Sequence, residues 1–260
     1  DAQESRGLGD VYKRQVVASL FLSVFNGYGV EPDLSLESMA VSASDNKRHF
    51  SILAPYPKPE PAMNERTTSA SWASGIVKAL ELEGLDCPAL FHKLGLDFAA
   101  LSDPDARFTQ DSMTRLWQLA EELSGNRAIG LNMARVVRPA SFHVVGYALM
   151  SSRTLAEGFG RLVRYQRIIA ESSDLSLQLG PEGHALILTV HGDHLPPTRH
   201  SSEASLACAL SLCSWLSGRT IQPRRVLIQG PQPDDIEPYR IAFHSPLTFN
   251  APYDLSLIHI

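Results

Sequence analysis

The sequence predicts an α+β fold in which N-terminal helices are followed by a small mixed or antiparallel sheet with a helix packed on it. Two of the three observations that favour this fold concern periodicity: apolar residues recur at helical spacing over residues 72–170, and strict alternation replaces that spacing over residues 175–190. A third is that residues 201–217 are apolar nearly all round, which is typical of a buried helix.

Several helix patterns fill the first half of the chain. The clearest begins at Thr109, whose hydroxyl suits the residue before a helix, and ends at Gly125. A second begins at Thr154 and carries Glu157 three residues later, the spacing of a capping box. The other expected helices cover residues 72–83, 88–94, 127–137 and 143–151, and the capped one runs to about residue 170.

Strand patterns dominate the second half. Leucines alternate with polar residues over 175–179 and apolar residues alternate again over 186–190, with Gly-Pro-Glu-Gly between them at 180–183. This arrangement predicts an antiparallel hairpin. Two further strands are expected over residues 224–229 and 247–249, separated by a short helix over 235–242.

The two ends of the chain are related through the DNA that can encode them. Residues 10–15, Asp-Val-Tyr-Lys-Arg-Gln, can be written GATGTGTATAAGAGACAG, whose reverse complement encodes Leu-Ser-Leu-Ile-His-Ile, the sequence of residues 255–260. Two ends of one protein have no reason to be encoded by inverted copies of one short DNA. We therefore expect residues 1–15 and 255–260 to be translated sequencing adapter.

A proline-rich stretch marks a further boundary. Prolines stand at 55, 57, 59 and 61, and residues 16–62 show no sustained periodicity. That segment is unassigned, and it is either disordered or untranslated. Met63, which precedes the first helix pattern, is the preferred start, with Met39 as the alternative. An effector-sensing domain is then expected over residues 63–254.

Composition excludes several classes of protein. The net charge of −5 gives no global attraction to nucleic acid or anionic membrane. The odd set Cys87, Cys208 and Cys213 is too small for a secreted disulfide framework, so core packing is expected for these side chains. The longest apolar run, residues 16–25, falls short of the ~20 residues that a spanning helix needs. These observations indicate a soluble cytoplasmic protein without membrane association.

Signals for catalysis or metal binding are weak. His184, His191, His194 and His200 lie close in the sequence, but they lack the helical spacing of a metalloprotease site, and polar loop histidines are favoured. The sequence contains neither a Gly-x-Ser-x-Gly elbow nor a glycine-rich phosphate loop. We therefore expect no enzyme, metal site or cofactor, and a small hydrolase is the least favoured alternative.

Candidate ligand-binding residues lie around the capped helix. Phe142, His143 and Tyr147 combine apolar bodies with polar tips and could line a pocket, although core packing explains them equally well. Arg164, beside Tyr165, could hold an anionic ligand through its guanidinium group, or it could belong to a solvated basic face. A free-standing haem sensor with His143 as the iron ligand is the main alternative function.

A set of motifs appears in a familiar order. Residues 145–155, Val-Gly-Tyr-Ala-Leu-Met-Ser-Ser-Arg-Thr-Leu, are followed by Arg164-Tyr165, and further motifs occupy residues 103–108, 129–131, 237–240 and 246–251. Their order resembles the N-terminal sensory domain of one branch of AraC/XylS-type bacterial transcription regulators, distinct from the cupin-like sugar domain. His244-Ser245 departs from the pattern, because many members carry glycine after the phenylalanine.

The resemblance implies a one-component regulator. Its N-terminal domain would bind a small-molecule effector, amino-acid-like or fatty-acid-like, and could form a homodimer. DNA would be bound only by a C-terminal pair of helix-turn-helix units, which is missing from this sequence. The effector, the target promoter and the direction of regulation do not follow from the sequence.

We predict that the purified chain does not bind promoter DNA. It is acidic and lacks the helix-turn-helix pair that would neutralise phosphates. A mobility-shift assay at low salt should show no retarded band, and a retarded band that disappears as salt is added would contradict this expectation.

Overall fold

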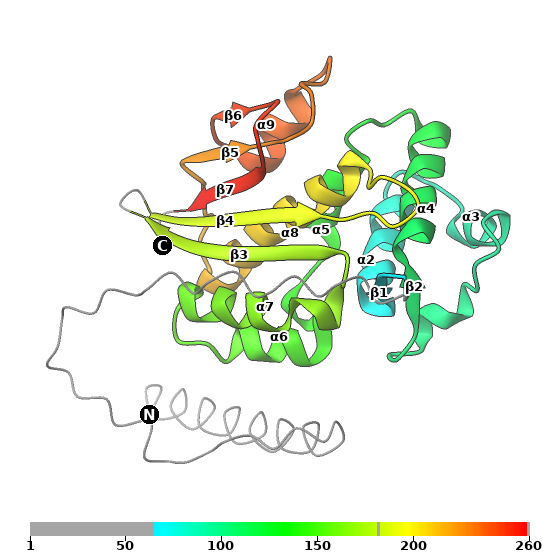
Figure 1. Ribbon diagram of the computed structural model, residues 1–260, viewed down its shortest axis with the longest axis horizontal. Helices are drawn as coiled ribbons and strands as arrows, with labels where there is room; N and C mark the ends of the chain where they lie inside the picture. The colour runs from blue at the N-terminus through cyan, green and yellow to red at the C-terminus, as the bar shows by residue number, and fades with distance from the viewer. Residues whose placement is uncertain (1–64, 181–182, 259–260) are drawn as a thin grey trace, which may run out of the picture. The chain divides into compact units, whose positions relative to one another are not determined.

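Helices fill the first half of the described chain and a five-stranded sheet lies in the second half (Figure 1). This arrangement, seen in a computed structural model that describes residues 65–180 and 183–258, confirms the predicted α+β class. Residues 1–15, the whole unassigned segment 16–62 and the preferred start Met63 lie outside the described residues, as do residues 259 and 260. The predictions made for them stay predictions.

The first half contains six α-helices and three short 3-10 helices among the described residues. The α-helices are α2 (Ala70–Glu81), α3 (Cys87–Lys93), α4 (Gln110–Ser124), α5 (Met133–Val136), α6 (His143–Met150) and α7 (Leu155–Ile169). The 3-10 helices are Ala99–Ser102, Ile129–Asn132 and Pro139–Phe142.

The second half contains two helices and the strands of the main sheet. The helices are α8 (Arg199–Ser217) and α9 (Glu237–Phe243). The strands are β3 (Ser173–Gly180), β4 (Gly183–Val190), β5 (Arg225–Leu227), β6 (Leu247–Thr248) and β7 (Asp254–Ile258).

The helix boundaries follow the capping residues seen in the sequence. The Thr109 hydroxyl accepts a hydrogen bond from the Ser112 amide at 3.2 Å, and α4 ends at Gly125, whose φ of 67° suits glycine. The Thr154 hydroxyl accepts from the Glu157 amide at 3.1 Å. The Glu157 carboxylate reaches back to the amide of Arg153, one residue before the cap, rather than to that of Thr154 itself.

The main sheet is mixed, with the strand order β3-β4-β7-β5-β6. All neighbours are antiparallel except β5 and β6, which run parallel. The predicted hairpin is confirmed, and its register places Leu175 opposite Leu188 and Leu177 opposite Leu186. These pairs give the hairpin an apolar face against which α8 packs.

Strand β7 was not predicted, because residues 255–258 were assigned to adapter. The structure places them between β4 and β5, with Leu255 and Leu257 buried. Pairing of the backbone does not report on the DNA that encodes it, so the adapter origin stays a prediction.

A second, two-stranded sheet was also missed. Strand β1 (Thr67–Ser69) pairs antiparallel with β2 (Arg107–Thr109), and Thr68 forms an additional bridge with Ala170 after α7. Three-residue strands are too short to show alternation in the sequence. The bridge brings the start of the described chain to the end of α7, which positions Thr68 for the site described below.

Two helical glycines provide a test of the packing around α6. A Cβ atom on Gly146 would lie 1.7 Å from the carbonyl oxygen of Pro139, whereas a Cβ atom on Gly160 in α7 meets nothing within 4 Å. We expect Gly146→Ala to lower the free energy of unfolding by at least about 2 kcal/mol through overpacking. Gly160→Ala should raise it by about 0.5–1 kcal/mol, because alanine favours the helix. Urea titration followed by circular dichroism measures both, and equal effects would contradict the packing described.

Candidate functional site

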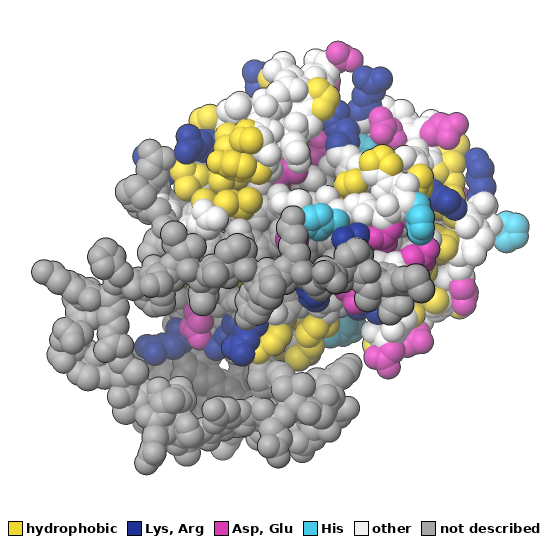
Figure 2. All heavy atoms as spheres, in the orientation of Figure 1, with side chains coloured by type: hydrophobic (Ala, Val, Ile, Leu, Met, Phe, Trp, Pro, Cys, Tyr) yellow, Lys and Arg dark blue, Asp and Glu magenta, His cyan; other side chains and the backbone are white. Residues whose placement is uncertain are grey.

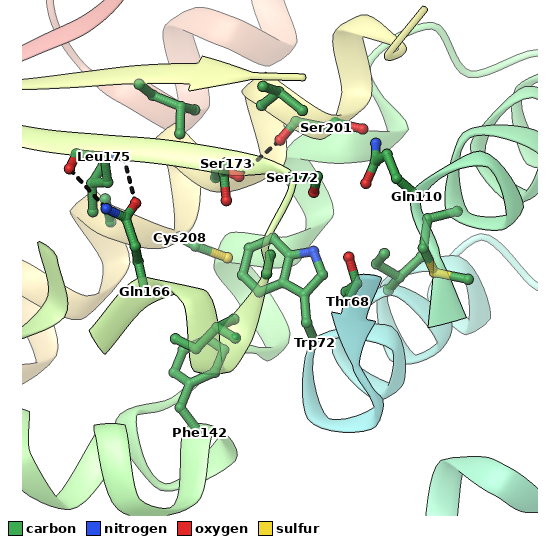
Figure 3. Close-up of a pocket in the computed structure, with 18 of the residues that line it drawn as sticks. Thr68, Trp72, Gln110, Phe142, Gln166, Ser172, Ser173, Leu175, Ser201 and Cys208 are labelled. Carbon is green, nitrogen blue, oxygen red and sulfur yellow. Dashed lines mark hydrogen bonds between the residues drawn. The ribbon is translucent and has the colours of Figure 1, made fainter. Parts of the chain in front are cut away.

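A cavity of about 90 Å³ lies where α2, α4, α7 and α8 meet the hairpin β3–β4 (Figure 3). Its wall is mainly apolar and consists of Trp72, Ile76, Met113, Trp117, Phe142, Leu162, Ile169, Ala170, Leu175, Leu188, Val190, Cys208, Ala209 and Leu212. The polar lining residues are Thr68, Gln110, Gln166, Ser172, Ser173, Ser201 and Ser205. Within the described residues, no charged side chain lines the cavity. Such a site suits a small molecule better than a macromolecule.

Three buried polar side chains converge at one end of the cavity. Figure 3 shows Thr68, Gln110 and Ser172 grouped there, with the indole nitrogen of Trp72 directed to the same end. Thr68 is 1% exposed, and Gln110 and Ser172 are each 3% exposed. Among the described residues, the Thr68, Gln110 and Ser172 side chains form no hydrogen bond with another protein group, and they border the cavity. Buried polar groups are normally paired with other groups. Because these side chains have no protein partner, their donors and acceptors are free to pair with a bound molecule.

The other end of the cavity is apolar and closely packed. Trp72 and Phe142 stack with ring centroids 5.9 Å apart and an interplanar angle of 23°. Leu162 of α7 and Leu212 of α8 add further apolar surface to the cavity lining. Burial raises the pKa of the Cys208 thiol, so this cysteine contributes a neutral, weakly polar surface. The cavity therefore has one hydrogen-bonding end and one apolar end.

Gln166 holds the wall together and is already fully engaged. Its amide nitrogen donates to the carbonyl oxygens of Val163 at 3.0 Å and Leu175 at 3.1 Å, and its amide oxygen accepts from the Leu175 amide at 2.5 Å. These bonds join α7 to β3 beside the cavity (Figure 3). Gln166 thus acts as a structural link rather than as a free ligand-binding group.

Hydrogen bonds around β1 fix the polar end. The Glu171 carboxylate accepts from the Thr67 amide at 2.9 Å and from the Thr67 hydroxyl at 2.6 Å. Burial acts to raise the pKa of Glu171, but these hydrogen bonds outweigh it and lower that pKa. The Arg66 guanidinium forms an ion pair with Asp193 at 2.6 Å. Thr68 therefore directly follows two anchored residues.

A buried charged cluster lies on the opposite face of α8 from the cavity. Arg199 donates to the Glu203 carboxylate at 2.8 Å, and the Tyr239 hydroxyl of α9 donates to Glu203 and accepts from Arg199. Glu203 is 1% exposed. Burial, followed by the charge of Glu203, raises the pKa of Tyr239. Burial alone lowers the pKa of Arg199, but the Glu203 charge outweighs it and raises that pKa. The cluster ties α8 to α9.

The structure places the predicted ligand-binding residues in different environments. Phe142 lines the cavity. His143, Tyr147 and Arg164 are exposed and do not line it. Tyr165 is half-buried against the core, with the Arg164 guanidinium carbon 5.8 Å from its ring centroid. Only Phe142 is thus brought to the cavity, and ligand binding by the other four stays a prediction about the surface of α6 and α7.

The histidines also differ from the expectation in one case. His191 lies 2.7 Å from Asp174, and His194 lies 3.1 Å from Asp111. His200 is not a loop residue as predicted, because it is fully buried in α8 and lies 2.9 Å from the Glu121 carboxylate. Residues 65–180 and 183–258 contain no group of three histidines, cysteines or carboxylates that could hold a metal ion.

Sequence reasoning missed the polar end of the cavity. Gln110 offered the one usable signal, because it precedes Met113 and Trp117 at helical spacing and so lies on the buried stripe of α4. Thr68 and Ser172 gave no such signal, since their positions depend on β1 and on the bridge to Ala170.

Comparison with known proteins identifies the family. The model of the arabinose-binding domain of AraC transcription regulators, an N-terminal domain, matches residues 84–257. The chain belongs to this family. The resemblance stated from the sequence motifs is confirmed, and the chain is a ligand-sensing regulatory domain of AraC type.

Two proteins of Pseudomonas aeruginosa show how far the similarity extends. The ornithine utilization regulator is 24% identical over 184 residues, which cover 70% of this chain and 54% of that protein. The crystal structure of the transcriptional regulator CdpR has a TM-score of 0.45 and 16% identity, over 72% of this chain and 54% of that one. The chain thus spans about half the length of these relatives. No helix in the described part of this chain is long and apolar enough to cross a membrane.

The Tyr239 hydroxyl provides a test of the buried cluster. Replacing Tyr239 with phenylalanine removes the group that joins Glu203 to Arg199 and leaves both partners short of a hydrogen bond. We expect Tyr239→Phe to lower the free energy of unfolding by about 1–3 kcal/mol. The control is Tyr147→Phe, which alters a tyrosine that is 46% exposed and should change stability by no more than about 0.5 kcal/mol. Equal stability of the two variants in urea would contradict the role given to the cluster.

Proposed function

We propose that the cavity between α2, α4, α7, α8 and the hairpin is the effector site of this regulatory domain. The observation that supports it most directly is the convergence of the unpaired side chains of Thr68, Gln110 and Ser172 on a largely apolar space. These side chains border the cavity, where a bound molecule can pair with their polar atoms.

The position of the cavity suits a sensor. Its wall is shared by elements from both halves of the domain, with Trp72 and Gln110 from the first half and Leu188 and Ala209 from the second. A molecule that contacts all of these elements stabilises the arrangement in which they close around it. Because a ligand shifts a conformational equilibrium only through such differential contacts, the cavity is well placed to convert binding into a change of packing.

The proposal extends to the whole regulator. DNA binding would reside in a C-terminal domain with two helix-turn-helix units, and the protein would act in the cytoplasm as a regulator without catalytic activity. It would form a homodimer. Apolar side chains gather over β5, β6 and α9 in Figure 2, and Ile241 of α9 is 62% exposed, which supports an association surface there.

The alternative haem sensor gains no support from the site. His143 begins α6, is exposed and does not line the cavity, which is lined instead by uncharged residues of other elements. The small-molecule effector is therefore the preferred occupant.

A variant that fills the cavity tests the proposed site. Ala209→Leu adds three carbon atoms to a lining residue of the 90 Å³ cavity and should block it without loss of stability. A panel of amino acids, short-chain acids, amides and alcohols is screened by thermal unfolding of the unmodified chain. We expect at least one compound to raise the unfolding midpoint of the unmodified chain and not that of the Ala209→Leu variant. A ligand present at 100 times its dissociation constant adds about 2.7 kcal/mol to the free energy of unfolding.

The matched control is Ala242→Leu, which enlarges a half-buried alanine of α9 outside the cavity. This variant should keep the ligand response. If every stabilising compound acts equally on the Ala209→Leu variant, the effector site lies elsewhere.

A further inference from the structure

We propose that the effector of this site is an uncharged molecule with a short apolar group and one polar head that both donates and accepts hydrogen bonds. The proposal rests on the assignment of the cavity as the effector site and specifies which chemical class it takes.

The charge of the lining excludes ionised groups from the preferred ligands. The lining found among the described residues contains hydroxyls, amides and apolar side chains but no Lys, Arg, Asp or Glu. The Arg and Glu residues of α8, Arg199 and Glu203, lie on its other face and are paired with each other and with Tyr239. A carboxylate or ammonium group in the cavity would lose its hydration without gaining a countercharge, which costs several kcal/mol.

The free side-chain groups at the polar end of the cavity determine which polar head group of the ligand can pair with them. Thr68 and Ser172 each offer a hydroxyl that can donate and accept, and the Gln110 amide offers an oxygen and a nitrogen. The Trp72 indole nitrogen, directed to the same end, can only donate. A carboxylate accepts only and an ammonium group donates only. A primary amide or an alcohol does both and can therefore pair with this mixed set.

The size of the cavity limits the rest of the molecule. A cavity of about 150 Å³ lined by apolar side chains accommodates benzene. The 90 Å³ available here is three fifths of that volume and suits a molecule of roughly four non-hydrogen atoms when the wall does not move, so a probe of six such atoms requires a small outward shift of the wall. With its head among Thr68, Gln110 and Ser172, the apolar part would extend toward Phe142 and Cys208 (Figure 3).

The chain carries its own optical probe for this site. Of its three tryptophans, Trp72 and Trp117 line the cavity and Trp215 is 50% exposed on α8. In a Trp215→Phe background, fluorescence reports on the cavity. We titrate that chain at pH 7 with butanamide, butanoate and butylamine, which share a short alkyl chain and differ in the charge of the head. Butanamide should give a saturable change, and the two charged compounds should bind at least tenfold more weakly.

Variants at the polar end test the assignment of the head. Thr68→Val and Ser172→Ala each remove one free hydroxyl and should weaken butanamide binding about fivefold, as expected for one hydrogen bond. Ser205→Ala is the matched control, because the Ser205 hydroxyl also lines the cavity but already donates to the Ser201 carbonyl at 2.9 Å. The affinity of the Ser205→Ala variant for butanamide should equal that of the parent chain. Circular dichroism spectra that match the parent confirm that each variant is folded.

The outcomes separate this inference from the proposed function. The inference of an uncharged head would be wrong if butanoate or butylamine bound as tightly as butanamide. It would also be wrong if the Thr68→Val, Ser172→Ala and Ser205→Ala variants all bound butanamide with equal affinity. The cavity would still stand as the effector site if that binding is lost in the Ala209→Leu variant. Binding by none of the three probes would overturn the inference as well, and the Ala209→Leu comparison with the wider panel would then judge the site alone.

Discussion

The burial of α8 is the constraint on which the rest of the domain depends. At its start, the Glu203 carboxylate is held by Arg199 and Tyr239 in a position from which water is excluded. Removing one partner from such a cluster leaves an uncompensated buried charge, so the cluster fixes where α8 begins and how it meets α9. A close backbone contact adds to this, because a Cβ atom on Gly130 would lie 2.6 Å from the His200 carbonyl oxygen. These contacts leave α8 little freedom to shift.

With α8 fixed on one face, its other face becomes a rigid wall of the cavity. Ser201, Ser205, Cys208 and Leu212 recur at helical spacing along that wall. The hairpin and α7 close two further sides, joined by the Gln166 amide. The polar end is completed only by β1, which the Glu171 carboxylate holds in place through Thr67. The site is thus assembled from parts far apart in sequence, each anchored by hydrogen bonds between protein groups. Such an arrangement is suited to a ligand that is read by shape and hydrogen bonding rather than by charge.

The sequence predicted the features that depend on local physics. The capping threonine at 109, the αL glycine at 125, the hairpin and the all-round apolar helix each have a short-range signal, and the structure confirms them. The features it did not predict depend on long-range contacts. Strands β1 and β2 are too short to show a period, and the residues of β7 were set aside as adapter. Of the predicted ligand residues only Phe142 reaches the cavity, because spacing on α7 could not show that Arg164 is directed to solvent.

In this domain the polar end beside Trp72 would bind the polar head group of an uncharged ligand. The most direct measurement is a ¹H–¹⁵N correlation spectrum of the chain during titration with butanamide, with the indole N–H resonances assigned by substitution of each tryptophan. The Trp72 indole resonance should shift in a saturable manner, because its N–H lies at the polar end, and the resonance of the exposed Trp215 should stay in place. A Trp72 resonance that does not move while butanamide binds, or one that moves no more than that of Trp215, would contradict this expectation.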